Sequence, residues 1–268
     1  MDGGLILVSP LDLALAAALV AALALGSLRG RLGVARALSI GAVRTVLQLL
    51  LVGLVLDTLF AIESPWLVGA WALVMLLVAG REVVARQARR FRGGRGYGIG
   101  VSSMFVASFS VTVLALVALL QVEPWYAPRY AIPLLGMLLG NTMTGVAVAL
   151  DRLTQSAWEQ RTLIEQRLML GQPYAAATEG LRRHATRAGL IPVTNAMAAA
   201  GLVSLPGMMT GQILAGVSPF EAVKYQILVM FLIAAGTGFG TLLAVRLGTA
   251  ALFDARERLR LDRLADGE

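Results

Sequence analysis

Long runs of apolar residues, separated by short polar segments, set the pattern of this chain. Seven runs approach or exceed the roughly 20 residues that a helix needs to cross a membrane. They predict an all-α, polytopic membrane protein with about seven transmembrane helices and a single membrane domain over residues 1–268. The predicted spans are residues 5–25, 38–62, 66–80, 98–120, 130–150, 190–216 and 225–247.

The polar segments between the runs alternate in charge. Those after the first, third, fifth and seventh runs are rich in arginine, and the others carry few charges. Because basic residues concentrate on the cytoplasmic side, this alternation places the N-terminus outside and the C-terminus in the cytoplasm. The longest basic segment, about residues 152–189, then lies in the cytoplasm between spans five and six. Gly171 and Pro173 in "LGQP" predict two short helices there, joined by a bend.

The composition agrees with a membrane protein. Hydrophobic residues make up 57% of the chain and charged residues 15%, and the mean hydropathy is +0.75. The net charge of +7 comes from basic residues at the ends of apolar runs, which favours membrane lipid over nucleic acid as a partner. The sequence contains no cysteine, which excludes disulfides and thiolate metal sites.

Charged and polar side chains inside the first two spans are candidates for function, because an ionised group among lipid tails is costly. Arg44 and Gln48 lie one turn apart on one face of the second span. Asp12 of the first span is a hypothetical partner of Arg44. A pair that only orders the two helices is the alternative.

The fifth span contains uncharged polar residues at its centre: Asn141, Thr142 and Thr144. Two interpretations stay open, hydrogen bonding between helices and the polar lining of a translocation pathway. Gly136 and Gly140 precede this cluster at the four-residue spacing typical of close helix contacts. We therefore expect another helix to pack against their face.

The stretch "SLPGMMTGQILAG", residues 204–216, interrupts the sixth run. Its proline lies about 24 Å along a helix that starts at residue 190, beyond the middle of a hydrocarbon core about 30 Å thick. We predict a kink or re-entrant turn at the outer gate of a pathway, and a kink that only serves packing is the alternative. The predicted lining residues are Pro206, Met208, Met209, Thr210 and Gln212, with the methionines as soft contacts for a metal.

Catalytic and nucleotide-binding motifs are not predicted. A Walker-type loop needs a lysine after a glycine-rich turn, but Lys224, the only lysine, follows Val223. His184 is the only histidine and lies among arginines, which disfavours a metal site or a catalytic triad there. We expect no enzyme activity and no cofactor bound by this chain, and the sequence locates no metal site.

Three stretches together resemble a known family: "LLGNTMTGVAVALDRL", "LGQPYAAA" and "GLIPVTNAMAAAGLVSLPGMMTGQILAGVSPFEAVKYQI". They are similar to the Fet-type permeases, membrane subunits of bacterial iron-export ABC transporters that are related to plant aluminium-tolerance membrane proteins. The resemblance implies a multi-pass permease of the bacterial inner membrane that exports iron. It also implies a cytoplasmic ATPase subunit that binds ATP and Mg²⁺, and a homodimer of permeases.

The cytoplasmic segment resembles the E-A-A coupling loop of ABC permeases, although Gln166 and Arg167 stand where that loop has two alanines. The resemblance implies that this segment docks into the ATPase. Gly171 would permit close backbone approach, and Arg167 would be available to acidic groups of the ATPase. The implied coupling residues are Glu165, Arg167, Gly171, Pro173 and Tyr174.

Three other functions stay open. In the first, the chain is a permease whose substrate is a nucleotide sugar, to which the plant relatives have been linked, or a metal ion other than iron. Alternatively, the chain is a non-transporting scaffold or lipid-handling protein whose basic loops bind anionic lipid. An intramembrane enzyme has the least support, since the chain has one histidine and no cysteine.

Overall fold

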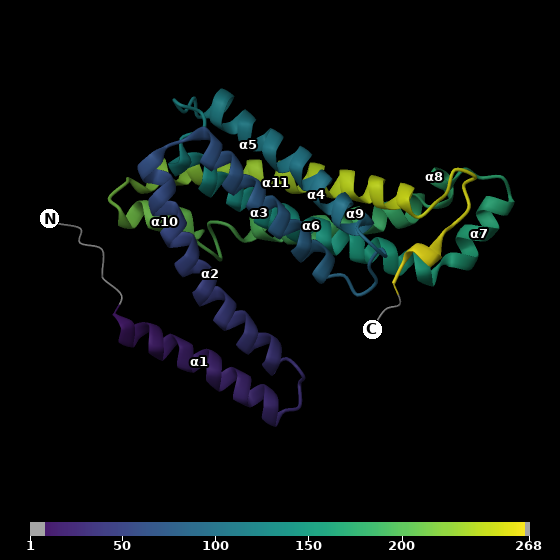
Figure 1. The fold of residues 1–268 in the computed structure, drawn as a ribbon, viewed down its shortest axis with the longest axis horizontal. Coiled ribbons are helices and arrows are strands. Elements are labelled where there is room, and N and C mark those ends of the chain that lie inside the picture. Colours follow the sequence, from purple (N-terminus) through teal and green to yellow (C-terminus); the bar gives the residue numbers. More distant parts are fainter. Residues whose placement is uncertain (1–8, 266–268) are drawn as a thin grey trace. The chain divides into compact units, whose positions relative to one another are not determined.

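The computed structural model describes residues 9–265, which form an all-α structure without a β-strand (Figure 1). Six of the described helices are long and apolar enough to cross a membrane. They match six of the seven predicted spans, so the prediction of an all-α polytopic membrane protein is confirmed. The start of the first predicted span, residues 5–8, lies outside the described residues.

The described chain divides into two compact units. The first contains α1 (Pro10–Arg29), α2 (Ala35–Ile62) and Leu214–Gly216. A capping box starts α1: Ser9 Oγ accepts a hydrogen bond from Asp12 N, and Asp12 Oδ2 accepts one from Ser9 N. Both helices expose apolar side chains along most of their length, as expected of helices that face lipid.

The second unit begins with α3 (Pro65–Ala85) and a helix over Arg95–Leu119, which match the third and fourth predicted spans. The second of these helices is not regular. It consists of α4 (Arg95–Met104), the π-helical turn η1 (Phe105–Phe109), α5 (Ser110–Leu114) and a second π-helical turn, η2 (Ala115–Leu119). Apolar periodicity alone does not reveal such turns, in which hydrogen bonds reach one residue further than in an α-helix.

Two long helices, α6 (Pro128–Glu159) and α11 (Pro219–Ala251), pack side by side in the second unit (Figure 1). The 32 residues of α6 cover about 48 Å at 1.5 Å per residue, more than the roughly 30 Å of a hydrocarbon core. The predicted fifth span, residues 130–150, lies within α6, which continues past it to Glu159. No glycine or proline after Gly145 interrupts it.

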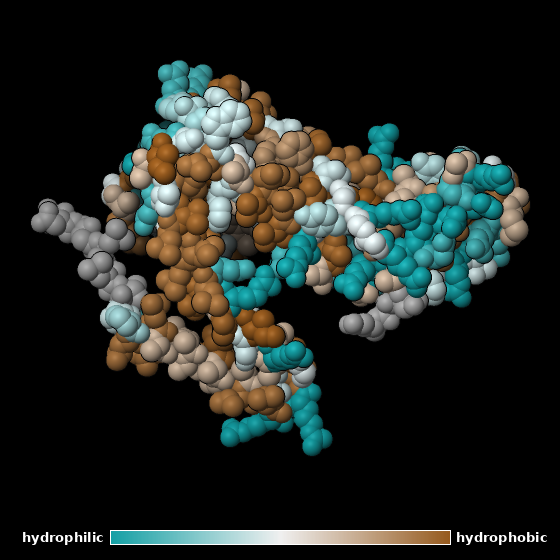
Figure 2. Space-filling model, in the orientation of Figure 1, coloured by the Kyte–Doolittle hydropathy of each residue, from teal (hydrophilic) through white to brown (hydrophobic). Residues whose placement is uncertain are grey.

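Two short helices, α7 (Arg161–Met169) and α8 (Tyr174–Ala177), follow α6 and confirm the predicted bend at "LGQP". Hydrophilic side chains cover this end of the second unit (Figure 2). The next helix, α9 (Glu179–Ala199), runs without a break past residue 190. The predicted separation of a cytoplasmic helix from the sixth span is therefore wrong.

The sixth predicted span is interrupted where the sequence indicates a break. α9 ends at Ala199, and α10 (Gly207–Leu214) begins after a turn. In this turn Gly201 has φ +86°, a left-handed conformation that favours glycine, and its N–H donates to Ser204 O at 2.9 Å. Neither α9 nor α10 is among the six described helices of membrane-spanning length and hydropathy.

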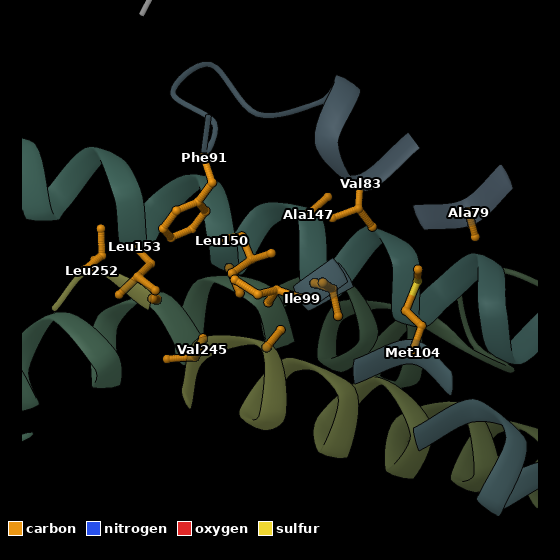
Figure 3. Close-up of a cluster of buried hydrophobic side chains, with 14 of the residues drawn as sticks. Ala79, Val83, Phe91, Ile99, Met104, Ala147, Leu150, Leu153, Val245 and Leu252 are labelled. Carbon is orange, nitrogen blue, oxygen red and sulfur yellow. The ribbon is translucent and has the colours of Figure 1, made fainter. Parts of the chain in front are cut away.

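The hydrophobic core of the second unit lies among α3, α4, α6 and α11 (Figure 3). Phe91, in the loop after α3, is also buried in it, beside the C-terminal segment: Arg92 N donates to Arg263 O at 2.7 Å. The Arg263 guanidinium donates to Ala251 O and Phe253 O, both at 2.8 Å, and so caps the end of α11. The C-terminal segment is thus fixed against the helical core.

Helices α6, α9 and α11 approach closely at glycines. A Cβ atom on Gly145 of α6 would lie 2.9 Å from Gly189 O of α9 and 2.9 Å from Thr241 Oγ1 of α11. A Cβ atom on Gly189 would lie 2.6 Å from Gly145 O. Of the two glycines predicted to meet another helix, Gly136 does, since its Cβ would lie 3.2 Å from Met75 Cε of α3, whereas no other described helix comes within 4 Å of a Cβ on Gly140. The close approach occurs five residues later in the same helix.

Candidate functional site

A polar groove of about 700 Å³ lies between the bend after α7 and the C-terminal segment after α11. We call it the α7–α8 groove. Three predicted coupling residues, Glu165, Gly171 and Pro173, line it together. Its other lining residues are Leu168, Met169, Gln172, Arg256, Glu257, Arg258 and Leu259.

The bend that forms one wall of the groove depends on Gly171. This residue has φ +83°, and its N–H donates to Leu168 O while Gln172 N donates to Arg167 O. These two bonds form a Schellman motif, which ends a helix with a left-handed residue. No atom of the described chain lies within 4 Å of the position of its Cβ, so close approach of a partner's backbone stays a prediction.

The opposite wall of the groove is held by Asp254. Its carboxylate accepts hydrogen bonds from Arg258 N at 3.0 Å, Arg258 Nε at 2.8 Å and Arg256 N at 2.9 Å. The backbone and side-chain hydrogen bonds from Arg258 lower the pKa of Asp254 to about 2. The carboxylate is therefore charged at neutral pH, and the turn that carries Arg256–Leu259 is ordered around it.

Tyr174 connects the two walls. Its backbone N–H donates to Glu257 Oε2 at 2.9 Å, and its ring lies 5.0 Å from the ring of Phe253. Arg167 is half-buried and donates from Nη1 to Ala177 O at 3.1 Å. It thus ties α7 to α8 with one of its five donors, and the others remain for a partner.

A second cavity, of about 550 Å³, lies where α9 ends and α10 begins, against the first half of α11. We call it the methionine cavity, because Met197, Met209 and Met230 converge on it. Gln226 of α11 also lines it, and its Oε1 is buried without a hydrogen-bond partner among the described residues. An unpaired buried carboxamide among thioethers is a plausible contact for a ligand that enters the cavity.

The predicted gate residues fall around this cavity. Pro206 and Met209 line it, whereas Met208, Thr210 and Gln212 do not. Thr210 donates from both N and Oγ1 to Pro206 O, at 3.1 and 3.3 Å, and so satisfies the carbonyl at the break. Gln212 Oε1 is buried without a described partner. A gating role for these residues stays a prediction.

The polar residues of the fifth predicted span point in different directions. Thr142 is fully buried and packs against Gly240 of α11. Asn141 is exposed and donates to Met137 O at 2.8 Å, and Thr144 donates to Gly140 O at 3.1 Å. Both bonds lie within α6, so helix-to-helix hydrogen bonding is not seen for these two side chains.

Arg44 and Gln48 lie in the first unit, on α2, and both are exposed. Their place in a pathway and the pairing of Arg44 with Asp12 stay predictions. Asp12 takes part in the capping box of α1.

The described residues contain no group of three or more His, Asp or Glu side chains that could hold a metal ion. Hard oxygen ligands are thus not gathered in this part of the chain. The methionine cavity offers soft thioethers and one carboxamide oxygen. Such a set suits a brief contact with a passing metal ion better than tight binding.

Sequence reasoning did not find Met197, Gln226 and Met230 in the cavity, or Arg256–Leu259 in the groove. The signal for Met230 and Gln226 was available, since the two residues lie four apart on one helix face. No local pattern predicts the fold of the C-terminal segment, because it depends on contacts with residues far away in the chain.

These features define a polytopic, all-α membrane protein with a polar groove at one end of its second unit and an apolar cavity against the first half of α11. Residues 10–253 match the model of a family described as "Uncharacterised protein family (UPF0014)", and the chain belongs to this family.

Named relatives confirm the predicted resemblance. The chain is 30% identical to "Probable iron export permease protein FetB" of Escherichia coli K12, over 94% of this chain and 95% of the relative. It is 37% identical to "UPF0014 membrane protein STAR2" of Oryza sativa, over 89% and 82%. It is 41% identical to "Protein ALUMINUM SENSITIVE 3" of Arabidopsis thaliana, over 70% and 66%. No solved structure matches the chain.

Proposed function

We propose that the chain is the permease subunit of an ABC transporter that exports iron and is driven by a separate ATPase subunit. The observation that carries the proposal is the α7–α8 groove, which brings Glu165, Gly171 and Pro173 together at the polar end of the second unit. The name of the relative from Escherichia coli, a probable iron export permease, supports both the class and the substrate.

In this proposal the arginine-rich ends of the helices face the cytoplasm of a bacterial cell, by the positive-inside rule. The α7–α8 groove then faces the ATPase, and its lining offers both charges, with Glu165 and Glu257 beside Arg256 and Arg258. ATP and Mg²⁺ bind to the ATPase. Two permeases pair with two ATPase chains, since nucleotide sites of such ATPases form between two chains.

The methionine cavity is the proposed outer part of the iron pathway. Thioethers and the Gln226 carboxamide give contacts strong enough to attract the ion and weak enough to release it. The residues predicted from the sequence, Arg44, Gln48, Asn141, Thr142 and Thr144, remain candidates for other parts of the pathway.

The test is reconstitution of the full chain with its ATPase in proteoliposomes. We expect ATP-dependent transport of ferrous iron and ATPase activity that the permease stimulates. Gly171→Trp should abolish this stimulation, because it places a bulky side chain in the groove and a non-glycine residue at φ +83°. Gln155→Trp, on the exposed end of α6 outside the groove, is the matched control.

Each result decides between the candidate functions. Unchanged stimulation in Gly171→Trp would show that the groove does not couple to the ATPase. Transport of another metal or of a nucleotide sugar in place of iron would replace the substrate and keep the permease. Absence of any associated ATPase would favour a scaffold or lipid-handling protein.

A further inference from the structure

A third hollow, of about 790 Å³, lies between residues 179–194 of α9 and the last third of α11. We call it the arginine groove. It shares no lining residue with the α7–α8 groove or the methionine cavity. Its basic lining residues are Arg182, Arg183, Arg187 and Arg246, and its apolar lining residues are Leu190, Ile191, Leu242 and Val245.

The charge of this groove is unbalanced. Its one acidic lining residue, Glu179, pairs with Arg183 at 2.8 Å. Arg182 reaches only Ala175 O, at 3.5 Å. Arg187 and Arg246 are exposed and have no hydrogen-bond or ion-pair partner among residues 9–265. Two guanidinium groups on facing helices are thus free for an anionic ligand, and guanidinium matches the geometry of phosphate oxygens.

The two ends of the groove differ in polarity. One face of α9 passes from basic to apolar. Helical spacing places on this face, in order, Arg183, Arg187, Leu190 or Ile191, and Thr194. From Arg183 to Thr194 the groove extends about 16 Å along α9, close to half the thickness of a hydrocarbon core. On α11 a basic residue is likewise followed by apolar ones, since Arg246 lies beside Val245 and one turn from Leu242.

We propose that the arginine groove binds an anionic phospholipid, with its headgroup phosphate between Arg187 and Arg246 and an acyl chain along the apolar half. A free phosphate would use only the basic half and make no contact with Leu190, Ile191 and Leu242. Basic pockets between membrane helices are known to suit lipid headgroups. This site is independent of the iron pathway and of the α7–α8 groove.

The test is lipid binding to the full chain in detergent, followed by native mass spectrometry with phosphatidylglycerol as the probe. The double variant Arg187→Gln, Arg246→Gln should weaken phosphatidylglycerol binding about 30-fold, because each basic residue near an anionic surface contributes roughly fivefold to the affinity. Arg187→Lys with Arg246→Lys should retain most of the binding. The matched control, Arg90→Gln with Arg152→Gln, removes two exposed arginines outside the groove and should change binding less than about threefold.

Three results would overturn the proposal. The first is equal binding by the wild type and the Arg187→Gln, Arg246→Gln variant. The second is an equal loss in the control, which would indicate general attraction to positive charge. The third is a loss of selectivity, seen as equal binding of phosphatidylcholine or as displacement of the lipid by millimolar inorganic phosphate. Displacement by phosphate would identify a site for free anions. None of these readouts uses the ATPase or iron, so they are separate from the test of the permease.

Discussion

Glycine serves two different purposes in the second unit. At Gly171 the backbone is left-handed and the surrounding space is open, whereas at Gly145 and Gly189 the backbone is helical and the space is filled. A side chain at the first position strains the backbone, and a side chain at the others collides with a neighbouring helix. Substitutions at these positions should therefore fail for different reasons and in different assays.

The close approach at Gly145 can be tested with alanine. Gly145→Ala places Cβ 2.7 Å from Thr237 Cγ2 and 2.9 Å from Gly189 O, so we expect a loss of about 1–3 kcal/mol in stability from overpacking. Gly140→Ala, in the same helix and in open space, should be neutral or slightly stabilising. Thermal unfolding in detergent, followed by size-exclusion chromatography, should show a lower Tm for Gly145→Ala alone. Equal Tm values would contradict the close packing.

The break between α9 and α10 is the element that gives the methionine cavity its wall. The left-handed Gly201 and the proline before α10 end one helix and start the next. The cavity then lies between this break and α11, where Gln226 is held without a described partner. A buried unpaired carboxamide lowers stability by about 1–3 kcal/mol, which favours a role in function.

Replacing that carboxamide separates function from stability. Gln226→Leu removes an unpaired polar atom and keeps a similar volume, so we expect unchanged or higher stability. If Gln226 contacts the transported ion, transport in proteoliposomes should fall about tenfold, the equivalent of one contact of about 1.4 kcal/mol. Gln155→Leu on the exposed end of α6 is the control. Full transport in Gln226→Leu would remove the cavity from the pathway.

The distribution of charge along the chain predicts its orientation in the membrane. The end that carries α7, α8 and the C-terminal segment is hydrophilic (Figure 2), and the loop between η2 and α6 is at the other end of α6. By the positive-inside rule we expect the first of these ends to face the cytoplasm. The absence of cysteine from the sequence makes this orientation directly measurable.

Single cysteines should report the two sides of the membrane. Glu123→Cys in the loop before α6 should react with a membrane-impermeant maleimide in intact cells, because the expected orientation places that loop outside. Gln160→Cys, exposed between α6 and α7, should react only after the cells are opened. The cysteine-free wild type supplies the background. The opposite pattern of labelling would reverse the orientation.

Sequence patterns predicted the parts of this fold that depend on local chemistry. Apolar runs located six membrane-length helices, and the glycine and proline of "LGQP" located the bend at the α7–α8 groove. The ends of helices were less predictable, since α6 continues to Glu159 and α9 continues through Gly189 and Pro192 without a break. The methionine cavity and the wall around Asp254 depend on contacts between distant segments, which no local pattern contains.

Gly145 divides α6 into two arms of similar length. Gly145, which α9 and α11 both approach closely, lies 14 residues from Glu159 (159 − 145) and 17 from Pro128 (145 − 128), or about 21 Å and 26 Å along the axis. A tilt of about 10° about this pivot moves the two ends by about 4 Å in opposite directions. In the proposed permease, a force applied at α7 would reach the far end of α6 through the segment that contains Pro133, a residue without the backbone N–H that the helix ladder uses.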